Sequence, residues 1–116
     1  MGNELSSLDN ELLNGYVQSL GQDIVKKMLT LYSQQSLIYL ADIEAALLCD
    51  SAELWQEHCH KMKGAAGSVG LKSLHARLVV MEKSMDGTTK KAQQLAELNS
   101  HNNQAIADFN AWLESI

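Results

Sequence analysis

Residues 60–70 read HKMKGAAGSVG, a run that places a histidine, a lysine and three glycines within about three helical turns. The flanking residues favour helix, so the run is placed on a helix with about 100° between successive side chains. With His60 at zero, Lys63 falls near about −60°, Gly64 near about +40° and Gly67 near about −20°. We therefore expect one helix face to carry an imidazole, a cation and two positions without side chains.

The opposite face of the same helix is apolar, which predicts how the helix packs. Its members recur at three-and-four spacing and point roughly 80 to 180° away from His60. They are Ala52, Trp55, Cys59, Met62, Ala66 and Val69. His60 is accordingly expected to face outward, with Glu53, Gln56 and Glu57 around it.

The two glycines beside His60 call for an explanation, because glycine in a helix costs about 1 kcal/mol relative to alanine. One explanation is functional: another molecule must come close to the imidazole. The other is structural: a neighbouring helix packs closely against Gly64 or Gly67. The spacing by itself favours neither explanation.

A wider pattern around the histidine is informative. His60-x-x-Lys63-Gly64, followed by Gly67 and Gly70, resembles the signature of histidine phosphotransfer (HPt) domains. The run from Lys63 to Leu71 is similar to HPt modules at the C-terminal end of bacterial hybrid sensor kinases. The likeness also covers Leu8-Asp9, Tyr16-Val17-x-x-Leu20-Gly21 and helix-forming sequence to about Glu82.

This resemblance implies a phosphorelay role for the residues around His60. His60 would be the phosphoacceptor, because a neutral imidazole is a nucleophile near physiological pH. Lys63, one turn away, would bring a cation to the phosphoryl oxygens. Gly64 and Gly67 would leave room for a partner, and Gln56 and Glu57 would belong to the docking surface.

The resemblance also implies the partners. Receiver domains of a hybrid sensor kinase and of a response regulator would bring the aspartate, the bound Mg²⁺ and a lysine. The chain itself would then hold no metal and no cofactor, and would have no kinase activity of its own. We expect it to act as a monomer.

The composition narrows the class of protein. The chain has 116 residues, no proline and a net charge of −5, which indicates one helical domain over residues 1–116 and argues against nucleic-acid binding. No apolar run reaches the roughly eighteen residues of a membrane span, and the first residues do not show the pattern of a signal peptide. We expect a cytoplasmic protein. It could be free-standing, but the resemblance to C-terminal modules favours a domain excised from the cytoplasmic end of a membrane-bound sensor kinase. Cys49 and Cys59 are expected to be reduced and in or near the core.

The hydrophobic pattern predicts an all-α, antiparallel up-down four-helix bundle with an additional short N-terminal helix. Residues 1–7 are expected to be frayed, and residues 1–6 only formally fit an N-myristoylation pattern. The expected helices run from Leu8 to Leu20, from Gln22 to about Cys49, from an Asp50 or Ser51 cap to about Val69, from Leu71 to Met85, and from Lys90 to Ser115.

Some details of these helices are expected from local composition alone. A bend or a break is possible at residues 33–36. Residues 99–103 are the most polar part of the last helix and the place where disorder is most expected. Ser7 or Asp9 would cap the first helix, Gly21 would end it, and Gly70 would end the third. Inward positions include Ile24 and Met85. His58 is expected to be structural. His75 and His101 have no visible companions in the sequence and are expected to be solvent or packing residues, while Lys90-Lys91 is expected to be a solvated face.

Two other classes of protein remain as alternatives. The first is a helical interaction module with the same bundle but no phosphorylation, against which the intact His60, Lys63 and Gly64 count. The second is a metal-dependent hydrolase built on a bundle, which would need inward Glu and Glu-x-x-His ligands. The chain has only one such motif, Glu57 to His60, and it faces outward.

Overall fold

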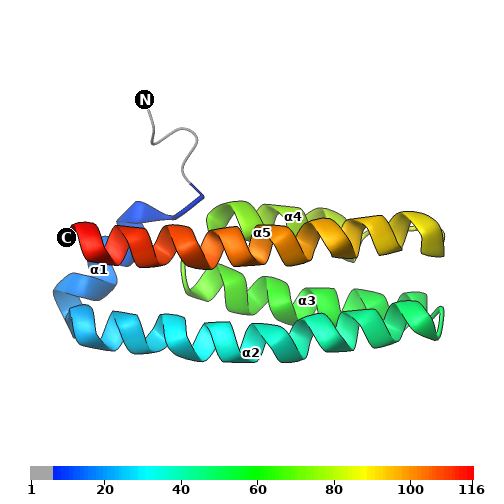
Figure 1. Cartoon of the computed structure of the whole chain (residues 1–116), viewed down its shortest axis with the longest axis horizontal. Helices are drawn as coiled ribbons and strands as arrows, with labels where there is room; N and C mark the ends of the chain where they lie inside the picture. The colour runs from blue at the N-terminus through cyan, green and yellow to red at the C-terminus, as the bar shows by residue number, and fades with distance from the viewer. Residues whose placement is uncertain (1–6) are drawn as a thin grey trace.

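The computed structural model describes residues 7–116, which form five helices (Figure 1). These are α1 (Asn10–Leu20), α2 (Gln22–Leu48), α3 (Ala52–Ser68), α4 (Lys72–Glu82) and α5 (Thr88–Ser115). Contacts join α2 to α3, α3 to α4, α4 to α5 and α5 back to α2, while α1 packs on α2. The predicted four-helix bundle with an additional short N-terminal helix is confirmed.

The helix ends lie where short polar residues and glycines can support them. The Asp9 side chain accepts the Leu12 N–H at 3.1 Å, and the Ser51 hydroxyl accepts the Leu54 N–H at 3.1 Å. Of the two caps considered at each end, Asp9 and Ser51 are therefore the ones used. Gly21 separates α1 from α2 with a φ of 88°, a conformation that glycine adopts without strain.

The segment before α1 is held by hydrogen bonds from Ser7 onward, so the expectation of fraying is wrong for that residue. The Ser7 carbonyl accepts the Ser73 N–H at 3.2 Å, and its hydroxyl donates to Asp108 at 2.7 Å. The Asp9 N–H donates to the Gly70 carbonyl at 2.8 Å. Residues 1–6, including the formal myristoylation pattern, lie outside the described part of the chain.

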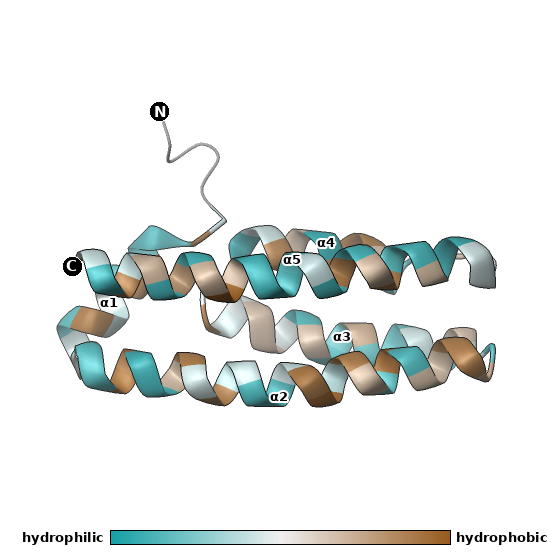
Figure 2. Cartoon of the chain, viewed as in Figure 1, coloured by the Kyte–Doolittle hydropathy of each residue, from teal (hydrophilic) through white to brown (hydrophobic). Residues whose placement is uncertain are grey.

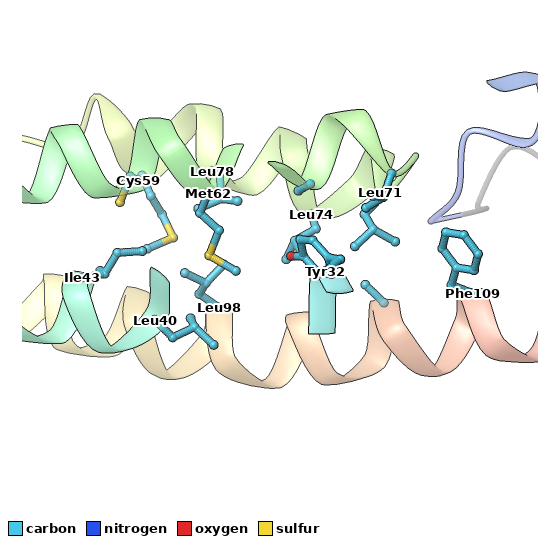
Figure 3. Packing of buried hydrophobic residues seen from close by; sticks show 14 of the residues in the cluster. Tyr32, Leu40, Ile43, Cys59, Met62, Leu71, Leu74, Leu78, Leu98 and Phe109 are labelled. Carbon is cyan, nitrogen blue, oxygen red and sulfur yellow. The ribbon is translucent and has the colours of Figure 1, made fainter. Parts of the chain in front are cut away.

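The core runs along the axis of the bundle that α2, α3, α4 and α5 form (Figure 3). Apolar side chains from α2, α3, α4 and α5 meet there because each helix buries one stripe. The largest fully buried apolar side chains are Trp55, Phe109, Leu13, Ile43, Met62, Leu71, Leu74, Leu78, Leu98 and Val25. The apolar face of α3 that the sequence predicts is buried from Trp55 to Val69, whereas Ala52, at its first turn, is exposed.

A buried polar seam joins α2 to α5 within this core. The Tyr32 hydroxyl donates to Asn102 Oδ1 at 2.8 Å, and Asn102 Nδ2 donates to the Ser36 hydroxyl at 3.0 Å. These partners satisfy polar atoms that would be costly to bury alone. The sequence-based expectations of a break near Ser36 and of disorder around Asn102 are both wrong, since each residue lies within a continuous helix.

Several expectations about individual residues are corrected by where the helices end and which helix faces which. Met85 was expected inward but is 92% exposed, because α4 stops at Glu82. Lys91 was expected in solvent, yet it is buried with its ammonium 5.1 Å from the centroid of the Trp55 ring. Ile24 and Cys49 are exposed rather than inward.

Within residues 7–116, no helix is both long and apolar enough to cross a membrane.

The turn between α3 and α4 yields a test of the packing. Gly70 has a φ of 75°, and a Cβ added there would lie 2.9 Å from the Leu13 side chain. Gly70→Ala should therefore lower the free energy of unfolding by at least about 1–2 kcal/mol, from the left-handed backbone alone. Urea denaturation followed by circular dichroism measures this loss.

Gly15→Ala is the matched control for that substitution. Gly15 lies inside α1 with open space around the added Cβ. We expect this variant to be at least as stable as the parent, because alanine is the better helix former by roughly 0.5–1 kcal/mol. Equal unfolding curves for the two variants would contradict the structural role given to Gly70.

Candidate functional site

His60 lies on the solvent face of α3, with 65% of its side chain exposed. Its Nδ1 atom is 3.0 Å from the Oε2 atom of Glu82, at the C-terminal end of α4. An ionised carboxylate can only accept hydrogen bonds, so Nδ1 must carry the proton in this contact. The other ring nitrogen, Nε2, then has a free lone pair when the ring is neutral.

Lys63 binds the other oxygen of the same carboxylate. Its ammonium lies 2.6 Å from Glu82 Oε1, and the side chains of Lys63 and Glu82 are 23% and 13% exposed. The hydrogen bond from Lys63 lowers the pKa of the Glu82 carboxyl, burial acts in the opposite direction, and the contacts with His60 lower it further. Glu82 is therefore an ionised carboxylate at neutral pH that holds two groups of α3.

Glu82 is the residue of this cluster that sequence reasoning missed. It lies 22 positions beyond His60 and belongs to a different helix. The apolar pattern of α4 places it at the edge of the buried stripe formed by Leu74, Leu78 and Met81. That pattern does not say whether Glu82 faces α3 or α5, because only the packing of the bundle determines this.

The two glycines next to His60 have different surroundings. A Cβ added at Gly64 would meet nothing within 4 Å, so this position lies beside open space. A Cβ added at Gly67 would lie 3.0 Å from the Cδ2 atom of His75. Gly67 thus allows α4 to pack closely and does not extend the open surface, which corrects the expectation for this residue. His75 is a packing residue, as expected.

The other expected site residues lie around His60 without bonding to it. Gln56 and Glu57 are exposed on the same helix, and Glu57 pairs with Lys61 at 3.5 Å. His58 points toward α2, where its Nδ1 atom lies 4.0 Å from Asp42, and only 18% of its side chain is exposed. His58 is therefore placed at the edge of the core and away from the outer face of α3.

His101 has partners, contrary to expectation. Arg77 Nε donates to His101 Nδ1 at 2.8 Å, and His101 Nε2 lies 3.2 Å from the Ser73 hydroxyl. Burial and the Arg77 guanidinium lower the pKa of His101, against a smaller opposing effect of Asp108. Since Nδ1 accepts a hydrogen bond, Nε2 carries the proton and cannot take one from Ser73. This serine–histidine pair is therefore unsuited to nucleophilic catalysis.

The described residues offer little to a metal ion. Over residues 7–116 there is no group of three or more His, Cys, Asp or Glu side chains that could hold one. Burial, with a smaller effect of Glu82, raises the pKa of the Cys59 thiol to about 12, so that this cysteine stays neutral inside the core.

Comparison with known proteins identifies the class. The family model of the Hpt domain matches residues 27–113, and the chain therefore belongs to the Hpt domain family. Among solved structures, the histidine-containing phosphotransfer domain of ArcB from Escherichia coli has the same fold. The two share 22% sequence identity over 94% of each chain, with a TM-score of 0.83. The comparison with curated proteins gave no match.

The different surroundings of the two glycines can be tested by melting. Gly64→Ala should raise the thermal midpoint, because alanine favours helix by about 1 kcal/mol and meets no neighbour. Gly67→Ala should gain less or lose stability, because the His75 ring must move to admit the methyl group. Thermal denaturation of both variants checks this order, and a larger gain for Gly67→Ala would refute it.

Proposed function

We propose that the chain relays phosphoryl groups between receiver-domain aspartates, with His60 as the phosphoacceptor. Members of the Hpt family are phosphotransfer modules and not kinases. The observation that supports His60 most directly is its contact with Glu82. This contact occupies Nδ1 and leaves Nε2 on an exposed side chain as the free nucleophile.

The transfer step is a displacement at phosphorus. The Nε2 lone pair attacks the phosphorus of an aspartyl phosphate, an N–P bond forms, and the P–O bond to the aspartate breaks. The aspartate leaves as a carboxylate, and the ring keeps its proton on Nδ1 beside Glu82. Onward transfer is the reverse displacement, in which an aspartate of a second receiver domain attacks and His60 leaves.

Little covalent chemistry is needed from the protein for such a step, because phosphoryl transfer depends mainly on positioning and charge neutralisation. Lys63 is the cation of this chain near the reacting group, since it lies one turn from His60. The proposal assigns the attacking or leaving aspartate, a bound Mg²⁺ and a further lysine to the receiver domain. The chain would contribute no cofactor.

The docking surface is proposed to lie on α3 and extend onto α2. Gly64 leaves open space beside His60, and Gln56 and Glu57 are exposed on the same helix. On α2, Leu31 and Ile38 are 65% and 54% exposed, although both are apolar. They border a groove between α2 and α3 that is also lined by Met28, Tyr32, Gln34, Gln35, Ala65, Ser68 and Val69.

Helix α1 adjoins the same surface at its far end. The Tyr16 hydroxyl donates to the Ser68 carbonyl at 2.9 Å, which ties α1 to the last turn of α3. Hydrophobic segments are also frequent in the half of α2 that leads to α3 (Figure 2). A receiver placed over His60 would thus meet exposed apolar side chains of α2, such as Leu31 and Ile38, with α1 beside them. Such a contact must be transient, so we expect a small interface and a monomeric chain.

Phosphorylation at a single residue is the first test of this function. His60→Gln should abolish acid-labile labelling by a phosphorylated receiver domain, because no other histidine combines exposure with a neighbouring cation. His58→Gln is the matched control and should keep most of the label, since His58 faces α2. Site mapping of the labelled protein gives the direct readout.

If His60→Gln still takes up the acid-labile phosphoryl label, His60 is not the phosphoacceptor. If no receiver labels the parent protein, the alternative of an unphosphorylated interaction module with the same bundle becomes the better explanation.

The docking surface is tested by NMR titration with an unphosphorylated cognate receiver. Shifts should centre on α3 around His60 and spread to α1 and α2, while α5 stays largely silent. Leu31→Ser should weaken binding roughly tenfold by removing an apolar contact. Val80→Ser is the matched control, because Val80 is 68% exposed but lies on α4. Shifts concentrated on α5 would show that the surface is misplaced.

A further inference from the structure

One carboxylate serves two groups that the proposed reaction needs. Glu82 Oε2 lies 3.0 Å from His60 Nδ1, and Glu82 Oε1 lies 2.6 Å from the Lys63 ammonium. With a neutral ring, the charges of Lys63 and Glu82 cancel. The charge of the site is therefore balanced before phosphorylation. When a phosphoryl group is added to His60, it affects both contacts of Glu82.

We propose that Glu82 limits the lifetime of the phosphohistidine, by keeping the proton on the phosphorylated ring and by competing for Lys63. Glu82 would act as a positioning residue, since it contacts Nδ1 and not the reacting nitrogen. This inference rests on the proposed phosphorylation of His60, and the two can fail separately.

The first part of the argument concerns the ring proton. A ring with phosphorus on Nε2 and a proton on Nδ1 is cationic, and an anion at hydrogen-bond distance favours the charged form. Glu82 is such an anion and is only 13% exposed, so solvent screens it weakly. A protonated ring leaves phosphorus as neutral imidazole, whereas a deprotonated ring must leave as an anion. Retaining the proton therefore makes the N–P bond easier to break.

The second part concerns the lysine. In the resting protein the ammonium of Lys63 is engaged by Glu82, with 23% of the Lys63 side chain exposed. A phosphoryl group on Nε2 would add roughly two negative charges beside Lys63, and these charges would also attract its ammonium. Every interaction that Lys63 keeps with Glu82 then weakens its stabilisation of the phosphoryl group. Both effects of Glu82 act in the same direction, toward a short-lived phosphohistidine.

Glu82→Gln separates charge from hydrogen bonding. The glutamine amide oxygen can still accept from Nδ1, so the ring can keep its orientation, but the negative charge is lost. It would also free Lys63 for the phosphoryl group. With phosphoramidate as donor, the donor P–N bond breaks, ammonia leaves and the new N–P bond forms on Nε2. No receiver domain is needed for this labelling.

The expected result is a longer-lived label. After removal of phosphoramidate, the phosphohistidine of Glu82→Gln should hydrolyse about tenfold more slowly than that of the parent at pH 8, because the phosphorylated ring then lacks the neighbouring anion that favours its protonated form, which is the better leaving group. In hydrolysis, water attacks phosphorus, the N–P bond breaks and inorganic phosphate leaves. Glu114→Gln, which removes an exposed carboxylate near the C-terminal end of α5, should leave the lifetime unchanged.

Three outcomes would overturn the inference. They are a lifetime in Glu82→Gln within twofold of the parent, a shorter lifetime, and an equal lengthening in Glu114→Gln, which would show an effect of net charge alone. Persistence of label in His60→Gln would instead overturn the proposed function.

A measurement on the parent protein guards against misfolding of the variant. Nitrogen-15 NMR of the phosphorylated parent should show the His60 ring protonated on Nδ1 at pH 7.5. A deprotonated Nδ1 at that pH would refute the role given to Glu82, whatever the variant does.

Discussion

The structure depends on the division of α3 into a buried face and an open face. Trp55, Cys59, Met62 and Ala66 are at most 1% exposed, whereas 65% of the His60 side chain is exposed one residue beyond Cys59. Burying a large apolar side chain contributes about 1.5–3 kcal/mol, so rotation of α3 by even a fraction of a turn would be costly. The exposure of the histidine is thus set by the core on the other side of the same helix.

Neighbouring helices then complete what α3 begins. Close approach of α4 at Gly67 positions its C-terminal turn so that Glu82 reaches both His60 and Lys63. The buried seam of Tyr32, Asn102 and Ser36 joins α2 to α5, and polar groups of this kind favour one register because a shifted register leaves them unpaired. The geometry of the site therefore depends on the buried face of α3, on the close contact of α4 at Gly67 and on the seam between α2 and α5. Only α3 and α4 supply side chains to the site itself.

The sequence predicts those features that depend on one helix at a time. The five helices, the buried face of α3, the outward placement of His60 and the role of Gly21 all follow from periodicity and capping. Features that need two helices escape such reasoning. Glu82 beside His60, Lys91 over Trp55 and Arg77 beside His101 are contacts between elements, and no local pattern specifies them. Met85 was misplaced because nothing local marks the end of α4 at Glu82.

The segment at residues 7–9 also has a mechanical meaning. Ser7 is bonded to Ser73 and Asp108, and Asp9 to Gly70, so three bonds tie this short segment to α4, to α5 and to the turn between α3 and α4. A pull applied at Ser7 is therefore carried directly by the start of α4 and by α5, and reaches α1 only after these bonds give way. The load therefore enters α4 at its first turn, whereas Glu82, which contacts His60, lies at the last residue of the same helix.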